Sequence, residues 1–384
     1  MNLVPFGSVC SLQNGRAFKP EEWSASGTPI VRIQNLNDET KPFNYCDFEV
    51  EKRFHVDSGD LLFSWSGTPG TSFGAFFWDR GKGFLNQHIF RVDTDERHIY
   101  KNYLRYAINS KLDLIIDQAH GGVGLKHITK GKLEAVEIPL PPLPEQKRIA
   151  AILDKADAIR RKRQQAIQLA DNFLRAVFLD MFGDPVANPK GWKTKALKDI
   201  AKIQIGPFGT QLHKEDYIEG GVPLVNPTHI VKGLIVPKND LTVSAQKHAE
   251  LPEYHLKVGD IIMGRRGEMG RCAVIGEKES GWLCGTGSLF LRPNKAGVFS
   301  EYLNKFLSSD AMKSHLESES QGATMPNLNK AIVGNIQVPV PSNSVLERFA
   351  EIKEKILGAK AIYSKFSEEK SFDAISQKAF SGQL

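Results

Sequence analysis

Residues 138–185 read IPLPPLPEQKRIAAILDKADAIRRKRQQAIQLADNFLRAVFLDMFGDP, a long helical pattern bounded by proline and glycine. The prolines up to Pro144 exclude a regular helix before that point, and Gly183 followed by Pro185 ends it. The helix should therefore begin near Pro144 and end near Phe182. At a rise of 1.5 Å per residue, about 38 residues reach roughly 55 Å, which is more than one compact domain needs. The stretch predicts a helical spacer.

Apolar residues recur along this helix every seven positions. One row is Ile152, Ile159, Ala166 and Phe173, and a second is Leu153, Ile167, Leu174 and Met181, with Arg160 interrupting it. Rows of this kind are typical of a coiled-coil seam. We therefore expect the helix to pack against another helix.

Length and composition suggest an ordinary soluble protein with more than one domain. The chain has 384 residues, 41% hydrophobic and 24% charged, with a net charge of +6. This length suits two domains and a spacer, and the small basic excess only slightly favours a nucleic-acid partner. The start, MNLVPFGSVC, lacks the basic region and apolar core of a signal peptide. Glycine and proline interrupt the uncharged run 61–78, so we expect no membrane segment.

Motifs for cofactors, metals and catalysis are weak. The cysteines Cys10, Cys46, Cys272 and Cys284 form no CxxC pair, which predicts reduced thiols in a cytoplasmic protein without a metal site. The GGVG run at 121–124 lacks the rest of a nucleotide-binding pattern. The GxSxG match at 70–74 precedes a strand-like sequence, whereas a nucleophile elbow opens a helix. We therefore expect no cofactor and no catalytic centre.

The chain also repeats itself, mostly at an offset of 200 residues. The matching segments are GDLLF at 59–63 with GDIIM at 259–263, IPLP at 138–141 with VPVP at 338–341, and GTPIV at 27–31 with GVPLV at 221–225. A helical pattern follows each copy. The predicted order is a domain at 1–143, a spacer helix at 144–184, a domain at 185–342 and a second spacer helix at 343–384.

This order predicts an α+β protein in which two homologous mixed α/β domains are separated by a pair of long antiparallel helices. Two such helices in one chain pack most simply as an antiparallel pair with a pseudo-two-fold axis. The two domains would then face inversely related targets, and double-stranded DNA is such a target.

Three segments make the chain resemble the specificity subunits of type I restriction-modification systems. They are PLPPLPEQKRIA at 139–150, FLDMFGDPVANPKGW at 178–192 and FDAISQKAFSGQL at 372–384. The resemblance implies two target recognition domains, each reading one half of a split DNA sequence. It also implies a non-catalytic subunit that docks modification subunits, which methylate adenine, and restriction subunits, which hydrolyse ATP and cut DNA. SNSVL at 342–346 replaces PLPEQ at 142–146, which argues against equal docking at the two helix starts.

The candidate DNA contacts lie mainly where the two copies share a frame but differ in side chains. We predict Arg32, Gln34, Asn35, Trp65, Gln87, His88, Lys126 and Lys130 in the first domain, and Asn226, Thr228, Arg265, Arg266, Arg271 and Lys330 in the second. Arginine and amide side chains can pair with base edges, and lysines beside flexible loops can contact phosphates.

Each of these residues also has a structural explanation. The charged side chains can be solvated surface groups, Trp65 can pack in a core, His88 can be a structural histidine, and asparagine and threonine are common in turns. Two other functions also stay open. One is a repeat scaffold that binds protein and oligomerises through its helices, and the other is a fused restriction-methylation enzyme. The latter is disfavoured because the Asn-Pro-Pro-aromatic tetrad of adenine methyltransferases is absent.

Overall fold

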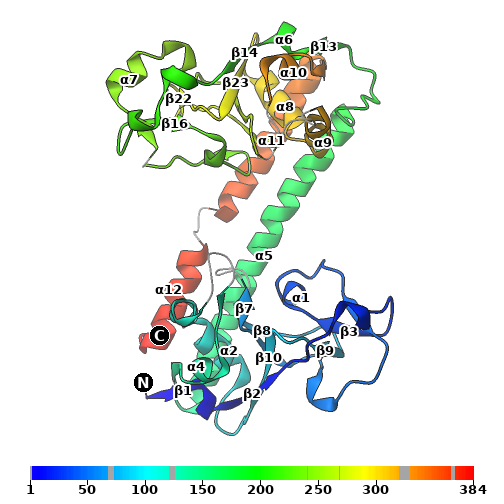
Figure 1. The fold of residues 1–384 in the computed structure, drawn as a ribbon, viewed down its shortest axis with the longest axis vertical. Coiled ribbons are helices and arrows are strands. Elements are labelled where there is room, and N and C mark those ends of the chain that lie inside the picture. Colours follow the sequence, from blue (N-terminus) through cyan, green and yellow to red (C-terminus); the bar gives the residue numbers. More distant parts are fainter. Residues whose placement is uncertain are drawn as a thin grey trace. The chain divides into compact units, whose positions relative to one another are not determined.

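The computed structural model of the chain describes residues 2–67, 73–120, 126–239, 241–267, 269–319, 328–364 and 368–384. The 121–124 loop and Gly70-Thr71-Ser72 of the GxSxG match lie outside these ranges. The contacts divide the chain into two units (Figure 1). The first unit is Met1–Gln165 with Ser364–Leu384, and the second unit is Ala166–Tyr363. Each unit contains part of the long helix.

That helix, α5 (Leu143–Phe182), has 40 residues and is continuous in Figure 1. Its bounds agree with the start near Pro144 and the end near Phe182 that the sequence predicts. Gly183 follows with φ at 81°, a left-handed conformation that glycine adopts without strain. Its N–H donates to the Leu179 carbonyl at 2.8 Å, which satisfies one acceptor at the helix end.

The first unit is built on two four-stranded sheets. One is antiparallel, in the order β2 (Cys10–Asn14), β10 (Ile89–Thr94), β6 (Leu61–Ser64) and β8 (Gly74–Phe77). The other is mixed, in the order β4 (Asn44–Cys46), β3 (Thr28–Val31), β9 (Gly83–Leu85) and β5 (His55–Val56). Two short pairs complete it, β1 (Leu3–Pro5) with β12 (Glu137–Pro139) and β7 (Ser66–Gly67) with β11 (Lys126–His127). Its shorter helices are α1 (Ile33–Asn37), α2 (Lys101–Asn109), α3 (Leu112–Gln118) and α4 (Lys130–Glu134).

The second unit repeats the antiparallel sheet and the pairing of its first strand with its last, and its mixed sheet again contains one parallel pair. Its antiparallel sheet runs β14 (Ala201–Ile205), β23 (Ser288–Pro293), β20 (Ile261–Gly264) and β21 (Cys272–Val274). Its mixed sheet has the order β15 (Tyr217–Ile218), β19 (Thr242–Val243), β16 (Val222–Val225) and β22 (Leu283–Cys284). Its two short pairs are β13 (Thr194–Ala196) with β24 (Gln337–Pro339) and β17 (Ile230–Val231) with β18 (Leu234–Ile235). Its shorter helices are α6 (Leu197–Ile200), α7 (Ala245–Ala249), α8 (Val298–Leu307), α9 (Asp310–Glu319) and α10 (Lys330–Gly334). The internal repeat in the sequence is therefore a repeat of fold.

The repeated Gly-Asp pair forms the same turn in both units. Gly59 and Gly259 have φ at 96° and 84°. Each aspartate carboxylate accepts a backbone N–H three residues before it, at 2.8 Å, and this closes the turn that leads into β6 or β20. Asp260 also forms two hydrogen bonds with Arg292, at 2.8 and 2.6 Å. The motif that best reveals the repeat is therefore a structural turn.

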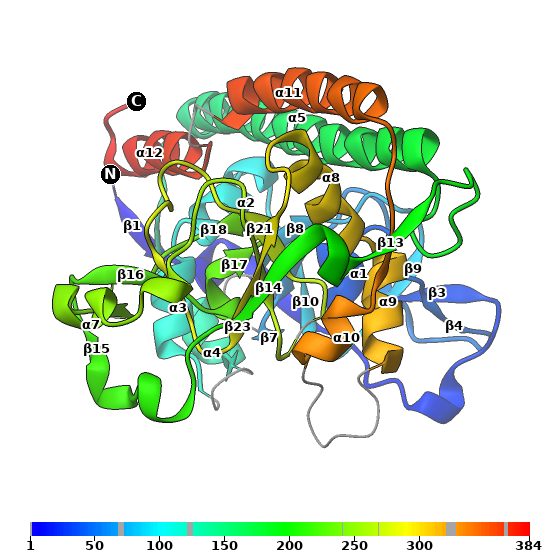
Figure 2. The same ribbon diagram turned by 90° about the horizontal axis from the view of Figure 1, so that it is seen from above.

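Within the second spacer helix that the sequence predicts at 343–384, the described residues form α11 (Asn343–Ser364) and α12 (Glu368–Ser381). In the second unit, α11 lies beside α5 in both views (Figure 2). Lys360 pairs with Asp171 at 2.6 Å, whereas Phe349 contacts Phe182, so the two helices run antiparallel. In the first unit, α12 packs on the N-terminal part of α5.

The two apolar rows of α5 have different environments. Leu153 and Leu174 of the second row are 0% and 4% exposed, as a packed seam requires. In the first row, Ile159 and Phe173 are 51% and 58% exposed, so the prediction that this row is also buried is wrong. One helical face is already filled by the neighbouring domain and helix, which leaves the adjacent stripe outside.

Candidate nucleic-acid interface

Several predicted residues of the first unit meet at one edge, where β3, β6 and β9 end. Arg32 follows β3, Trp65 follows β6, and His88 comes three residues after β9. The Trp65 N–H donates to the His88 carbonyl at 3.2 Å, and the Ile128 N–H donates to the Trp65 carbonyl at 3.1 Å. These bonds bring β11, which carries Lys126, to the same edge.

The Arg32 side chain is held in place by two residues that sequence reasoning missed. Its guanidinium lies 5.2 Å from the centre of the Trp23 ring, and one of its nitrogens donates to Asn44 Oδ1 at 3.2 Å. Both partners lie outside the repeated segments, so no sequence pattern connected them to Arg32. An arginine fixed in this way keeps further donors for an acceptor outside the protein.

Asn35 has a different role from its neighbours. It is 1% exposed, and its Oδ1 accepts the Arg32 N–H at 3.1 Å. Its Nδ2 donates to the carbonyls of Lys41 and Pro42, at 3.2 and 3.3 Å. The side chain therefore stabilises the turn that presents Arg32. Gln34 is more open, with Nε2 3.3 Å from the Pro42 carbonyl.

Trp65 and His88 pack against each other at this edge. The Trp65 ring stacks on Phe90 with centroids 5.7 Å apart and meets the His88 ring edge-on at 5.2 Å. Burial, followed by the charges of Arg32 and His127, lowers the pKa of His88. A neutral imidazole among cationic groups is therefore the favoured state. His127 stands on β11 beside Lys126 and is exposed.

The remaining predicted residues of the first unit are bound less closely to this edge. Gln87 is exposed in the loop after β9. Lys126 Nζ donates to the Ile116 carbonyl at 3.3 Å. Lys130 Nζ donates to the Leu12 carbonyl at 2.9 Å and lies 3.7 Å from Glu134. Lys130 thus belongs to α4 and β2 rather than to the Arg32 cluster.

The second unit has the same edge with other side chains. The Arg265 N–H donates to the Gly287 carbonyl at 3.0 Å, and the Leu328 N–H donates to the Arg265 carbonyl at 2.9 Å. Arg265 therefore occupies the position of Trp65, and Gly287 that of His88. Asn226 follows β16 as Arg32 follows β3, and its Oδ1 accepts the Gly287 N–H at 3.4 Å.

Three arginines give this second edge its positive charge. Arg265 is half-buried, and burial followed by the charge of Arg266 lowers its pKa. Arg266 is exposed. Arg271 donates to the Pro227 carbonyl at 3.2 Å. Trp65 and Ser66 occupy the positions of Arg265 and Arg266 in the first unit, so the two edges offer different donor sets.

The turn after β16 also parallels the turn after β3. Residues Pro227–His229 form one 3-10 turn, η6, in which Thr228 is exposed. His229 is 0% exposed, and its Nδ1 accepts the Asn226 N–H at 3.3 Å as Asn35 Oδ1 accepts the Arg32 N–H, so it fills the structural position of Asn35. Lys330 is exposed at the first position of α10.

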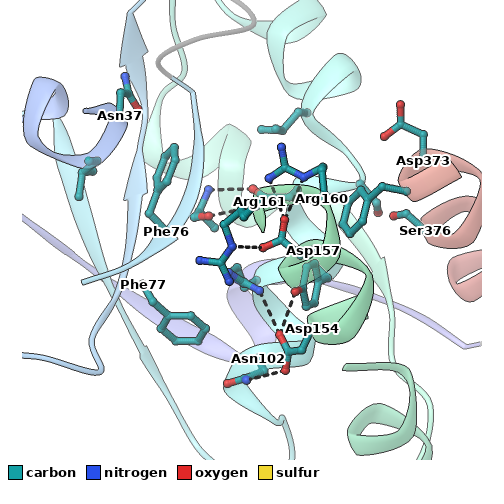
Figure 3. A pocket seen from close by; sticks show the side chains of 18 of the residues that line it. Asn37, Phe76, Phe77, Asn102, Asp154, Asp157, Arg160, Arg161, Asp373 and Ser376 are labelled. Carbon is teal, nitrogen blue, oxygen red and sulfur yellow. Dashed lines mark hydrogen bonds and ion pairs between the residues drawn. The ribbon is translucent and has the colours of Figure 1, made fainter. Parts of the chain in front are cut away.

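The first unit also contains a polar cavity of about 1410 Å³ lined by α1, α2, β8, α5 and α12 (Figure 3). Asp154 accepts hydrogen bonds from Asn102 at 3.1 Å and Tyr106 at 2.8 Å. Asp157 pairs with Arg160 at 2.7 Å and with Arg161 at 3.3 Å. Asp154 therefore links α5 to α2, whereas the partners of Asp157 lie on α5 itself.

Two features are absent from the residues that the structure describes. Within those ranges, no three His, Cys, Asp or Glu side chains are grouped as ligands for a metal ion. Over the same residues, no helix combines the length and apolar character needed to cross a bilayer.

Comparison with known proteins identifies the repeated fold. The family model for the type I restriction modification DNA specificity domain matches residues 1–169 and again 189–357. The EcoBI specificity subunit of Escherichia coli is 23% identical over 365 residues, covering 88% of this chain and 75% of that protein. The MjaVIII specificity subunit of Methanocaldococcus jannaschii is 24% identical over 322 residues, covering 79% and 73%.

A solved structure supports the same fold. The type I restriction-modification S subunit from M. genitalium superposes with a TM-score of 0.59 at 18% identity, covering 99% of this chain and 96% of that one. The two family matches together span most of the sequence. The chain belongs to the type I restriction-modification DNA specificity family.

Proposed function

We propose that this chain is the DNA-reading subunit of a type I restriction-modification complex, with the domains 1–143 and 185–342 each reading half of a bipartite site. The observation that supports this most directly is the shared edge. The same backbone hydrogen bonds present Trp65 in one unit and Arg265 in the other. A constant frame with exchanged side chains suits two domains that read different sequences.

The proposed contacts follow from exposure and chemistry. Arg32, Arg265, Arg266 and Arg271 would contact guanine edges or phosphates, and Gln34, Gln87, His88, Asn226 and Thr228 would contact base edges. Lys126, Lys130 and Lys330 would contact phosphates. Asn35 and Trp65 are assigned to support of the edge, because Asn35 is buried and Trp65 is packed on Phe90.

Chemistry would be supplied by partners. Modification subunits would dock on the exposed apolar side chains of the helix pair in the second unit and on the corresponding helices of the first. These side chains include Leu169, Phe173 and Leu179 of α5 and Leu357 and Ile362 of α11, which are 66%, 58%, 41%, 41% and 66% exposed. Exposed apolar stripes on helices are typical of protein interfaces. Restriction subunits would join the same cytoplasmic complex, and this chain would bind no cofactor and act as a non-catalytic subunit.

Mapping of methylated adenines in the host genome, with and without this gene, tests the proposal. A bipartite methylated motif should disappear when the gene is removed and return when it is restored. Binding to that motif should also weaken steeply with salt, because phosphate contacts release counterions. An unchanged methylation pattern, together with binding to protein but not to DNA, would favour the repeat-scaffold alternative.

A further inference from the structure

The β17–β18 hairpin of the second unit is the feature that the proposed contacts leave unexplained. Its register pairs Ile230 with Ile235 and Val231 with Leu234, around a turn made by Lys232 and Gly233. These turn residues have φ at 50° and 77°. Two positive φ values are the mark of the tight primed turn that matches the natural twist of a β-ribbon. The hairpin is therefore a short, well-defined ribbon.

The two faces of this ribbon differ. Ile230 is 1% exposed and belongs to a core cluster, against which Ile235 also packs, so one face anchors the ribbon. On the other face, Val231, Leu234 and Val236 are 46%, 69% and 51% exposed. Val231 and Leu234 are a cross-strand pair, and Val236 follows Leu234 by two residues, so the three share a side. Three aliphatic side chains thus stand together in solvent.

The first unit has a different structure at the corresponding place, after β3. There β3 leads into α1, and the apolar residues Ile33 and Leu36 pack against a core cluster. The copies therefore diverge in the segment that directly follows the edge residues Arg32 and Asn226. Only the second copy, within the described residues, turns aliphatic side chains outward at this point.

The surroundings of the ribbon fit DNA. Residues 226–239 contain Lys232 and Lys238 and no acidic residue. Gly233, in the turn of the ribbon, lies near the start of β21, because a Cβ added to it would be 4.0 Å from the Cys272 carbonyl oxygen. Arg271, the residue before Cys272, donates to the Pro227 carbonyl just before the ribbon. Three aliphatic side chains are too few for a stable protein interface, which uses about 20–30 residues a side. The major groove admits a two-stranded ribbon, and its apolar feature is the thymine methyl group.

We propose that the β17–β18 ribbon enters the major groove of the second half-site and that Val231, Leu234 and Val236 read thymine methyl groups there. This rests on the proposed function and adds a specificity element to it. The arginines beside the ribbon would supply the polar contacts, while the ribbon would favour thymine over cytosine at neighbouring positions.

The test removes the methyl group from the DNA and the aliphatic group from the protein. The complex of the full chain with its modification subunits first selects its site from a randomised duplex library. Thymines of the second half-site are then replaced one at a time by deoxyuridine, which lacks only the C5 methyl. Binding of the unmodified chain should weaken about three- to fivefold at the contacted position, the effect of one methyl group removed from an apolar contact. Leu234→Ser should be insensitive to that replacement.

Two controls separate the ribbon from general effects. Val258→Ser removes an aliphatic side chain that is 45% exposed at the opposite end of β20, and it should behave like the unmodified chain. Lys232→Ala should lower the salt dependence of binding by about one phosphate contact and keep the response to deoxyuridine. Thermal unfolding of Leu234→Ser should match that of the unmodified chain, because the side chain is exposed.

The outcomes distinguish this inference from the proposed function. If the complex selected no preferred sequence in either half-site, the proposed function itself would be refuted. A second half-site without thymine, or deoxyuridine without effect, would overturn only the ribbon. Loss of complex assembly in Leu234→Ser with DNA preference retained would assign the ribbon to a protein partner and would also overturn it.

Discussion

Replacing Phe349 with alanine should destabilise the second unit by about 3–5 kcal/mol, the usual effect of removing a buried aromatic side chain. Phe349 is 0% exposed. Its ring lies edge-on to Phe178 and Phe182, with centroids 5.7 and 5.2 Å apart. Such ring pairs contribute about 0.5–1.5 kcal/mol each beyond burial of area, which places the expected value toward the upper end. The destabilisation should come from weaker packing of α11 against α5.

Guanidinium unfolding followed by circular dichroism measures this change, with Phe173→Ala as the matched control. Phe173 is also an aromatic residue of the same helix pair, but it is 58% exposed, so its removal should change stability by less than about 1 kcal/mol. Phe173→Ala should instead weaken binding of a modification subunit. Equal midpoints for the two variants would refute the packing of α11 through this aromatic cluster.

Three further outcomes can be measured. Arg265→Ala or Arg266→Ala should weaken selection at one half-site only, by about 1–3 kcal/mol for a lost bidentate contact, and a site-selection assay showing equal loss at both half-sites would contradict this. The lowered pKa of His88 means that the unfolded chain binds a proton more readily than the folded one, so stability should fall as the pH drops below about 6.5. His88→Gln should reduce that slope in urea unfolding between pH 5 and 7.5, and an unchanged slope would argue against a partly buried, neutral histidine. Burial raises the pKa of Cys272 to about 12, so alkylation followed by mass spectrometry at pH 8 should be far slower in the native chain than in urea, whereas equal rates would place the thiol outside the core.

The long helix and the repeat could be predicted because both depend on local chemistry. Prolines before Glu145 and glycine at 183 limit α5 whatever surrounds it. The Gly-Asp turn recurs because a positive φ and a carboxylate that accepts a backbone N–H are needed at the same place in each copy. Such requirements are visible in sequence.

The side-chain environments could not be predicted because they depend on partners distant in sequence. Asn35 lies in a polar loop sequence, yet the turn after β3 buries it. Trp23 and Asn44 of β4 both contact the Arg32 side chain, and no sequence pattern links the three residues. Likewise, two heptad rows on α5 look equivalent in sequence, and only the packed domain decides that Leu174 is inside and Phe173 outside.

The first unit is assembled from the two ends of the chain, and this affects how the protein is made. Ala379 of α12 is 0% exposed in the same core cluster as Phe6 and Tyr103. A ribosome adding about 5–20 residues per second finishes residues 1–165 some 10–40 s before it delivers that helix. The second unit, continuous from Ala166 to Tyr363, is complete first. The N-terminal domain therefore keeps part of its core open until α12 has been synthesised, and a stop codon that removes α12 damages the domain that was synthesised first.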